Sequence, residues 1–326
     1  MRHFCTYFDS AYVWKGLSMY ESLKRVSSDF CLHVMALDDK SYTFLNQHAC
    51  DSLQVDFLGD IETEELLRLK GQRTRAEYCW TCGPAIIQHF IAKFNLPDIT
   101  YLDADLMFFS SFEPVYEEIG NASVAITPQY ADNDLSGRYC VQFMFFRNDP
   151  DGMACLQWWH DQCINWCFAR YEDGKFGDQK YLESFPTLFN HVVETTHRGV
   201  GVAPWNMDLY QYDDGVVHFE GRSYPIIFYH FHGLKMDIDD TTLVFKLTDC
   251  DCNATCRRVF FQPYMEQVAD TLRKYFNQDV SDFRMERLSV FTRAYKWLKS
   301  RLRHVGVLQK IYFSLHKHQG WESSKL

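Results

Sequence analysis

The first hundred residues alternate between short apolar runs and longer segments in which apolar side chains recur every three or four positions. Short runs rich in β-branched and aromatic residues predict strands, whereas the longer spacing predicts helices. The strands expected from this pattern are 3–9, 29–39 and 55–61, and the expected helices are 12–26, 62–70 and 82–94. Pro84 indicates the start of the last helix, because proline is tolerated in a first helical turn. This alternation predicts a parallel sheet with helices on both faces.

The second half continues with apolar segments of both kinds. Strands are expected at 122–130, 139–148 and 225–235, and a long aromatic helix at 151–171. The chain is expected to divide into an α/β domain, a helical extension of the same domain and a basic amphipathic helical tail, at residues 1–240, 241–283 and 284–326.

Two acids interrupt an apolar run, TYLDADLMFF at residues 100–109, which we expect to be a buried strand. Asp103 and Asp105 are costly to bury unless they are paired or bound to a metal. Neighbouring carboxylates repel each other, and hard cations such as Mg²⁺ and Mn²⁺ prefer oxygen ligands. The pair alone also fits a strand end with two solvated acids. Because Asp9 and Asp38 also follow apolar strands, a shared crevice beyond the carboxyl ends of the strands could collect these acids.

Further motifs follow in a distinctive order along the chain: TYFD at 6–9, YLDAD at 101–105, FGDQKYL at 176–182, APWN at 203–206 and HFHG at 230–233. This ordered set resembles the nucleotide-sugar glycosyltransferases related to glycosyltransferase family 8, the group that contains glycogenin and bacterial lipooligosaccharide galactosyltransferases. The resemblance covers roughly residues 1–240. It implies the GT-A fold, a Rossmann-like, mainly parallel mixed sheet with helices on both faces.

The resemblance also implies a metal centre. Asp103 and Asp105 would bind Mn²⁺ or Mg²⁺, which bridges the diphosphate of a UDP-sugar. The family's third ligand is a histidine in an H-x-x-G pattern, which His230 matches. His232 remains an alternative, since residues two apart on a strand face the same side. One or both histidines could instead satisfy a hydrogen bond in the core.

Asp178 and Gln179 match the family's Asp-Gln pair beside the donor sugar, which implies a catalytic role. Their sequence context, Gly-Asp before helix-forming residues, also fits an ordinary helix N-cap. Trp205 and Asn206 match a family loop near the donor or the acceptor.

The resemblance assigns the nucleotide to the end of the first strand, at Thr6, Tyr7 and Asp9. Tyr7 would stack on the base, although one more core aromatic residue fits equally well. Arg75 matches a basic residue that touches donor phosphate or sugar, with Arg73 as its competitor and an exposed arginine as the plain alternative.

Three positions depart from the family. Lys235 follows the HFHG motif and would contact phosphate, but its spacing is shorter than usual and the Pro-Trp that normally follows is absent. Cys140 and Gln142 stand where related sequences tend to have Asn and Gly. We therefore expect the donor sugar or the acceptor geometry to differ.

Composition and charge exclude some classes of protein and indicate the compartment. The 326 residues carry a net charge of −10, and outside 284–326 there are 23 Lys or Arg against 41 Asp or Glu, which argues against nucleic-acid binding. No export signal or membrane span is apparent, so the 12 cysteines are expected as free thiols in the cytoplasm. Cys79 and Cys82 are interpreted as buried small hydrophobes. Of the two cysteine groups, Cys250, Cys252 and Cys256 are the better metal candidate.

The tail at 284–326 holds ten Lys or Arg against two Asp or Glu. Its apolar residues fall on one helical stripe: Leu288, Phe291, Tyr295, Leu298, Leu302 and Val305. Such a helix would lie on the anionic inner face of a membrane, as a lipid-linked acceptor would require, or would pack on the acidic body of the protein.

The sequence therefore predicts a metal-dependent glycosyltransferase that moves a sugar from a UDP-sugar to a glycan or lipid-linked acceptor, with retention, in surface polysaccharide or lipopolysaccharide synthesis. A sugar-nucleotide pyrophosphorylase is one alternative, but TYFDSAYVWKG lacks the Gly-rich phosphate loop that it needs. A non-catalytic carbohydrate-binding protein is the other, and it would not need the ordered motifs.

Overall fold

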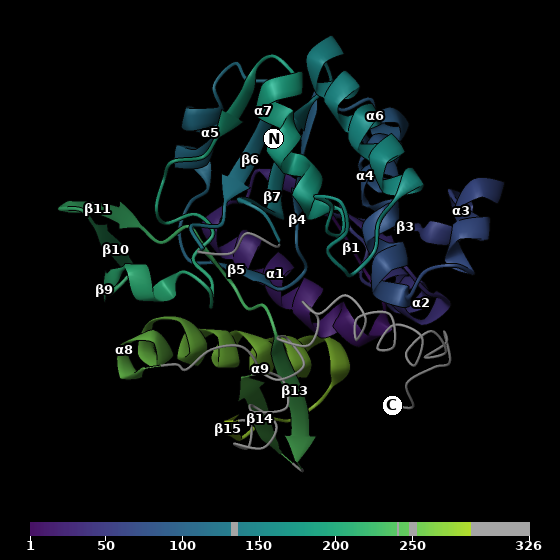
Figure 1. Cartoon of the computed structure of the whole chain (residues 1–326). Coiled ribbons are helices and arrows are strands. Elements are labelled where there is room, and N and C mark those ends of the chain that lie inside the picture. Colours follow the sequence, from purple (N-terminus) through teal and green to yellow (C-terminus); the bar gives the residue numbers. More distant parts are fainter. Residues whose placement is uncertain (132–135, 240, 248–252, 288–326) are drawn as a thin grey trace.

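The computed structural model describes residues 1–131, 136–239, 241–247 and 253–287 (Figure 1). Within these ranges a seven-stranded sheet has the order β3-β2-β1-β4-β7-β6-β8. β7 is antiparallel to both of its neighbours, and the other pairings are parallel. The predicted α/β architecture, with a mainly parallel sheet, is confirmed.

The strands of this sheet are β1 Arg2–Phe8, β2 Phe30–Ala36, β3 Leu53–Phe57, β4 Asp98–Leu102, β6 Val124–Pro128, β7 Tyr139–Arg147 and β8 Val192–Glu194. The smaller sheets are formed by β5 Leu106–Phe108 with β12 Phe228–His230, by β9 Gln211–Asp213, β10 Val216–Phe219 and β11 Arg222–Pro225, and by β13 Leu234–Asp239, β14 Thr242–Leu247 and β15 Asp282–Arg287. The α-helices are α1 Val13–Val26, α2 Asp39–Asn46, α3 Glu64–Lys70, α4 Arg75–Phe94, α5 Glu113–Ile119, α6 Pro150–Asn165, α7 Phe185–Leu188, α8 Ala254–Cys256 and α9 Gln262–Phe276.

Helix α4 begins at Arg75, so the prediction of a start near Pro84 was wrong, and Pro84 lies inside the helix. Thr74 accepts a hydrogen bond from the backbone of Glu77, whose side chain accepts one from the backbone of Thr74. This reciprocal capping box fixes the first turn. The start signal therefore lies at Thr74, and the internal proline does not end the helix.

The run at 100–109 is not one strand. β4 ends at Leu102, Asp103–Asp105 form a turn, and β5 begins at Leu106. The chain leaves the large sheet at this turn and pairs with β12 instead. Two carboxylates cannot lie in the buried middle of a strand without partners, and the turn places them at a strand end.

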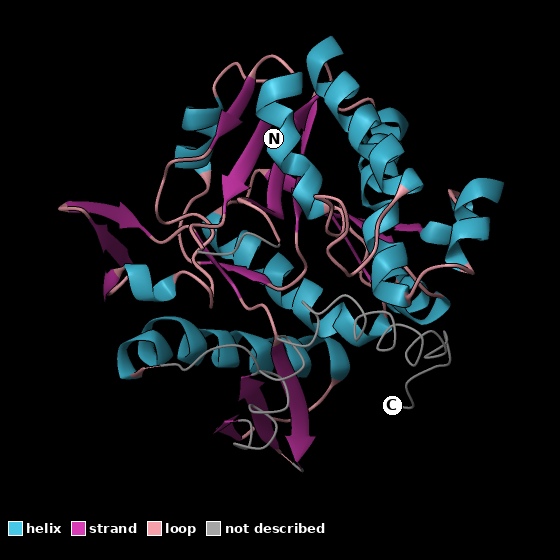
Figure 2. Ribbon diagram, viewed as in Figure 1, coloured by secondary structure: helices cyan, strands magenta, loops and turns pink. Residues whose placement is uncertain are grey.

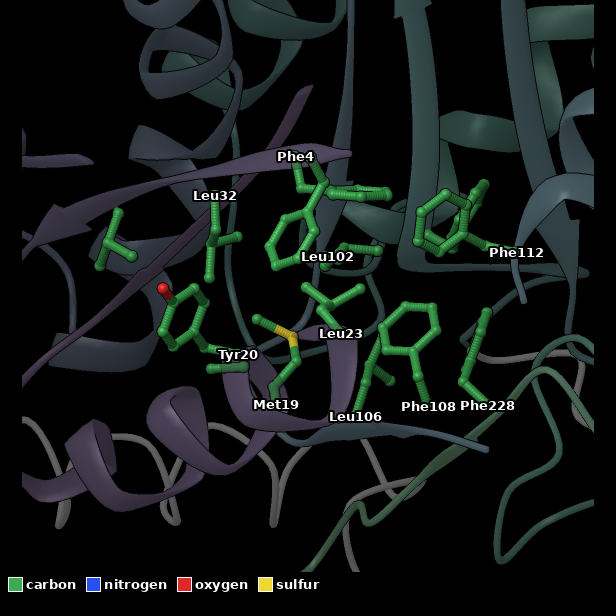
Figure 3. Packing of buried hydrophobic residues seen from close by; sticks show 14 of the residues in the cluster. Phe4, Met19, Tyr20, Leu23, Leu32, Leu102, Leu106, Phe108, Phe112 and Phe228 are labelled. Carbon is green, nitrogen blue, oxygen red and sulfur yellow. The ribbon is translucent and has the colours of Figure 1, made fainter. Parts of the chain in front are cut away.

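Helices cover both faces of the large sheet (Figures 1 and 2). One apolar cluster joins the sheet to α1 and α5, and a second joins the opposite face to α4, α6 and α7. Figure 3 shows the first cluster, in which Phe4, Leu32 and Leu102 from the sheet meet Tyr20 and Leu23 from α1. Each such side chain contributes about 1.5–3 kcal/mol when it is fully buried. This packing holds α1 against the sheet.

A third cluster is built from β12–β14, α8 and α9. α9 lies against α1, where Ser18 donates a hydrogen bond to Thr271. The segment 241–283, expected to be helical, contains these helices but also β14 and the start of β15. Residues 284–287, assigned above to the helical tail, lie in β15 instead. The rest of the predicted tail lies outside the described residues.

Cys250 and Cys252 of the predicted cysteine cluster also lie outside the described residues. The ten cysteines in the described ranges are all free thiols. Cys79 and Cys82 fall within α4, half-buried and buried. Across the part of the chain that the structure covers, no helix combines the length and the apolar character needed to cross a membrane.

Candidate functional site

The carboxyl ends of the parallel strands meet at one edge of the sheet, and the predicted site residues gather there. Asp103 and Asp105 follow β4 directly, and β5 pairs with β12 so that His230 lies opposite Leu106. Because β7 is antiparallel, its first residues, including Cys140 and Gln142, lie at the same edge.

The centre of the site is a cluster of two carboxylates, an imidazole and an ammonium group. His230 Nε2 lies 3.0 Å from Asp105 Oδ1 and 3.6 Å from Asp103 Oδ2. Lys15 Nζ, from the first turn of α1, lies 3.2 Å from Asp105 Oδ2. Tyr101 donates its hydroxyl to Asp103 Oδ1 at 2.8 Å. All four acidic and basic side chains are largely buried.

Backbone hydrogen bonds hold the segments of the cluster in register. The amide of Asp103 donates to the Gln142 carbonyl at 3.1 Å, and the amide of Phe231 donates to the Asp105 carbonyl at 2.9 Å. The amide of His230 donates to the Val202 carbonyl at 2.8 Å. The turn that carries the acids is thus tied to both β7 and β12.

The charges in the cluster compensate one another. Burial raises the pKa of Asp105, but the Lys15 ammonium and the His230 ring outweigh it and hold that pKa well below its usual range. Burial also favours a neutral His230, yet the charge of Asp105 outweighs it and raises the pKa of His230. Burial raises the pKa of Asp103. His230 is therefore a cation in the absence of a metal.

The geometry separates the two candidate histidines. His230 is buried and faces both carboxylates, whereas His232 is exposed, with its ring centroid 5.5 Å from that of His230. His230 Nδ1 lies 2.8 Å from Gln142 Oε1, which leaves Nε2 facing the acids. A second partner on the far nitrogen of the ring is the usual way in which proteins orient a histidine ligand.

Cys140 and Gln142, the departures from the family pattern, both contribute to this site. The ligating atoms of Asp103, Cys140 and His230 lie within 4.8 Å of one another. Gln142 holds the His230 ring, and its Nε2 is buried without a hydrogen-bond partner. A side chain at Gly201 would meet this Nε2 at 2.5 Å, so the space for Gln142 depends on that glycine.

Asp178 lies close enough to Asp103 for the two charges to interact. Burial, and then the charge of Asp103, raises the pKa of Asp178 to about 7. Its Oδ2 is buried with no hydrogen-bond partner, and its side chain does not cap the following 3₁₀ turn, Gln179–Ser184. Asp178 therefore occupies the N-cap position of this turn, as the motif suggested, but without the side-chain bond of an ordinary cap. The Gln179 amide donates to the Ser136 carbonyl at 2.9 Å.

Trp205 and Asn206 lie beside the cluster in different ways. The Trp205 ring packs edge-on against His230, with centroids 5.3 Å apart. The Asn206 side chain is buried and bonded to the backbone of Ala203, Gly201 and Gln129. Asn206 thus braces the loop, whereas Trp205 forms part of the wall around His230.

Near the end of β1, Tyr7 stacks on Tyr101, with ring centroids 5.3 Å apart. Tyr101 in turn donates a hydrogen bond to Asp103, so Tyr101 links Tyr7 to the cluster. Thr6 is fully buried, and its hydroxyl has no hydrogen-bond partner. Asp9 caps the short turn that follows β1.

Arg75 joins the ends of β1 and β2. Its guanidinium lies 2.5 Å from Asp9 and 3.2 Å from Asp38. Its competitor Arg73 is buried and donates to the carbonyls of Cys163 and Ile164 at the end of α6, which is a structural role. Lys235 is exposed in β13 opposite Lys246, and its phosphate contact stays a prediction.

The donor set fits a divalent cation. Asp103 and Asp105 offer oxygen ligands and His230 offers a nitrogen, a combination that suits Mn²⁺ and Mg²⁺. In the metal-free cluster, a proton on His230 and the Lys15 ammonium supply the positive charge beside the acids.

Lys15 was missed by the sequence analysis. Its position in an amphipathic helix suggests a solvated side chain, yet it is only 3% exposed. Its ammonium group also lies 4.4 Å from the centroid of the Tyr12 ring. No local pattern marks it, because its partner Asp105 is 90 residues away in the sequence.

The fold and this edge define the chain as an α/β protein with a buried Asp–Asp–His cluster beyond the carboxyl ends of its strands. It belongs to the same family as two uncharacterized proteins of Bacillus subtilis (strain 168), YfnF and YfnD. YfnF is 30% identical over 264 residues, which cover 76% of this chain and 87% of YfnF. YfnD is 31% identical over 245 residues, which cover 72% of this chain and 78% of YfnD. No family model matches the chain.

Solved structures with a similar arrangement include three glycosyltransferases. The galactosyltransferase LgtC, in complex with donor and acceptor sugar analogs, has a TM-score of 0.48 at 10% identity, and the match covers 82% of this chain and 95% of LgtC. Mouse xyloside xylosyltransferase 1 has a TM-score of 0.45 at 14% identity, covering 70% and 97%. The glycosyltransferase GlyE of Streptococcus pneumoniae TIGR4 has a TM-score of 0.41 at 16% identity, covering 60% and 45%.

Proposed function

We propose that the protein is a metal-dependent glycosyltransferase that transfers a sugar from a UDP-sugar to a glycan or lipid-linked acceptor, with retention, in surface polysaccharide or lipopolysaccharide synthesis. The observation that carries this proposal is the convergence of Asp103, Asp105 and His230 from distant segments on one point at the ligand-binding edge of the sheet. Their order in the sequence matches the family that the chain resembles.

Asp103, Asp105 and His230 would hold Mn²⁺ or Mg²⁺, which supplies Lewis-acid stabilisation of the departing diphosphate when bound. Tyr101 orients Asp103 through its hydroxyl. Gln142 orients His230 so that Nε2 faces the carboxylates. Lys15 keeps Asp105 ionised in the metal-free protein, where it supplies the positive charge that a bound cation would otherwise supply.

The nucleotide would lie over the ends of β1 and β2. There Thr6 offers a hydroxyl without a partner, Tyr7 an aromatic face and Asp9 a carboxylate. Arg75 bridges two acids at this edge and can turn toward phosphate oxygens. Trp205 would form the wall of the donor site, with Asn206 as a positioning residue behind it.

Asp178 would contact the sugar. A buried carboxyl group with an unpaired oxygen needs a partner, and a sugar hydroxyl supplies one. Gln179 begins the 3₁₀ turn that follows Asp178, and it would orient the donor sugar beside it. We favour front-side attack by the acceptor, because no residue of the cluster is an evident nucleophile and positioning supplies much of the rate.

The test is UDP release from a panel of UDP-sugars, with and without an acceptor, in Mn²⁺. Asp103→Asn should lower release by about 10²–10³-fold, the usual effect of losing one electrostatic stabiliser. Asp161→Asn, an exposed acid on α6, is the matched control and should leave release unchanged. Wild-type activity in folded Asp103→Asn would refute the proposal. Pyrophosphate-dependent formation of UTP would indicate a pyrophosphorylase, and sugar binding without turnover would indicate a binding protein.

We also propose that the basic tail at 284–326 contacts an anionic membrane surface, and this proposal rests on its composition. Vesicles of anionic lipid should co-sediment with the full chain more strongly than with a chain that ends at residue 287. Equal co-sedimentation of the two would refute a role for the tail in membrane binding.

A further inference from the structure

A second group of metal-ligating side chains lies at the opposite end of β1 and β2. His3 is near the start of β1, Cys31 and His33 are in the first half of β2, and the register places His3 beside Cys31. Their ligating atoms lie within 4.8 Å of one another. At a rise of about 3.3 Å per residue, His3 is about 20 Å along the strand from Asp9. This group is therefore separate from the Asp103–Asp105–His230 cluster.

The two imidazoles already lie at ligand spacing. His3 Nδ1 is 3.1 Å from His33 Nε2, and the rings are stacked with their centroids 5.4 Å apart. Two nitrogens bound to the same tetrahedral ion at about 2.0–2.1 Å lie only slightly farther apart than this. Little movement is needed to place an ion between them.

The surroundings are apolar and largely closed to water. Cys31 is 4% and His33 2% exposed, whereas His3 is half-buried at the rim. The His33 ring packs against Phe90 and Phe94 of α4, at centroid distances of 5.3 and 4.6 Å. His33 Nδ1 is nevertheless buried without a hydrogen-bond partner. This nitrogen is not the one that faces His3, so it would keep the ring proton while Nε2 binds an ion.

We propose that His3, Cys31 and His33 form a second metal site that takes Zn²⁺. Two imidazole nitrogens and a thiolate are ligands typical of zinc, and they differ from the oxygen-rich pair at the other end of the sheet. Three protein ligands leave one position of a tetrahedron for water, which can enter past half-buried His3. Both imidazoles bind in the neutral form, so binding releases one proton, that of the Cys31 thiol.

Such an ion would clamp β1 to β2 at their amino ends. Because both strands have neighbours on either side in the seven-stranded sheet, a ligand bound only by the folded state would raise the stability of the whole domain. The site would stabilise the fold, and it does not depend on the proposed sugar transfer.

The experiment uses Co²⁺ as a spectroscopic substitute for Zn²⁺ in the full chain after metals have been removed with a chelator. A thiolate bound to Co²⁺ gives a charge-transfer absorption band in the near ultraviolet, which carboxylate and histidine ligands alone do not give. We expect this band in wild type, and its loss on addition of Zn²⁺. Cys31→Ser should abolish the band. Cys140→Ser, which removes the thiol near the other site, should retain it.

The band could also be lost in Cys31→Ser because that variant unfolds, so His3→Gln is a second test. His3 is half-buried near the start of its strand, and its replacement should leave the fold intact. This variant should keep the wild-type circular dichroism spectrum and bind Co²⁺ at least about tenfold more weakly, since even the loss of a residue that only orients a ligand costs 10–100-fold. Zn²⁺ should raise the melting temperature of wild type more than that of His3→Gln. The proposal is overturned if wild type gives no band, if the band survives in Cys31→Ser, or if it disappears only in Cys140→Ser.

Discussion

Lys15 supplies part of the positive charge that two buried carboxylates need when no metal is bound. Its ammonium group neutralises Asp105 from one side while His230 does so from the other. A buried charge that loses its partner is strongly destabilising. The metal-free protein therefore depends on Lys15 more than the metal-bound protein would, because a cation would supply the same charge.

Lys15→Met should lower the free energy of unfolding of the metal-free protein by about 3 kcal/mol, the low end of the range for broken buried pairs, since Asp105 keeps His230. Added Mn²⁺ should raise the stability of this variant more than that of wild type. Urea unfolding with and without Mn²⁺ measures both effects. Lys24→Met, at an exposed position of the same helix, is the control and should change stability by less than about 0.5 kcal/mol. An equal response to Mn²⁺ in wild type and Lys15→Met would contradict the placement of the cation.

Asp178 should make the stability of the metal-free protein depend on pH. Its folded-state pKa is about 7, raised by burial from 3.8, so the folded state keeps a proton that the unfolded chain releases. The free energy of unfolding should fall as the pH rises from about 4 to about 7, with no further contribution above that range. Asp178→Asn should remove this part of the slope. Thermal melts between pH 5 and 8 measure it, with Asp161→Asn as the control that keeps the wild-type slope. Parallel curves for Asp178→Asn and wild type would contradict the assignment.

The pattern of apolar and polar residues predicted Asp103, Asp105 and His230 as site residues, but it did not predict Lys15. Asp103 and Asp105 stood out because they interrupt an apolar run, and His230 because it ends one. Lys15 did not stand out, since lysine on a helix is normally solvated. Its burial depends on Asp105, which is 90 residues away, and no local pattern records such a pairing.

At the scale of elements, the turn between β4 and β5 decides the geometry of the site. It connects the large sheet to the β5–β12 pair and carries both acids. The sequence predicted the apolar run and its place in the sheet but not the break. The break follows from long-range pairing of β5 with β12, and propensity within the run cannot reveal that pairing.

The segment between β8 and β9 contributes Gly201, whose φ of +73° is unfavourable for other residues. Gly201→Ala should cost about 1–2 kcal/mol of stability through backbone strain. Its new methyl group would also displace Gln142 from His230, so Mn²⁺ should bind about tenfold more weakly. Titration calorimetry with Mn²⁺ measures the affinity.

Gly215→Ala is the matched control for this prediction. Gly215 has a φ of +74°, but a side chain there would meet nothing within 4 Å. It should therefore show similar strain and unchanged Mn²⁺ affinity. Equal affinities for the two variants would show that Gln142 does not orient the metal ligand.

At the scale of the whole molecule, the third apolar cluster packs against the segment that carries His230. Phe231, which follows His230, stacks on Tyr264 of α9 with ring centroids 3.7 Å apart. The backbone amide of the same residue holds the Asp105 carbonyl. Phe231 thus connects the C-terminal layer to the turn that carries the acids.

Phe231→Ala should lower the free energy of unfolding by about 3–5 kcal/mol, because it leaves a cavity in a fully packed cluster. Tyr264→Phe tests the same contact differently. The Tyr264 hydroxyl is buried without a partner, so its removal should leave stability unchanged or slightly raised. Urea unfolding of both variants measures these values. A large loss in Tyr264→Phe would reveal a hydrogen bond made by that hydroxyl.

The cluster joins parts of the chain that are synthesised far apart in time. The contact of Lys15 with Asp105 spans 90 residues, and that of Gln142 with His230 spans 88. Contacts of such high sequence separation form late, after the loops between them have closed. A nascent chain would therefore lack the Asp103–Asp105–His230 cluster until residue 230 had emerged from the ribosome. If the proposed function holds, Mn²⁺ binding at this cluster would report that residues 15, 105, 142 and 230 have come together, and a folding intermediate in which they are still apart would not hold the ion there.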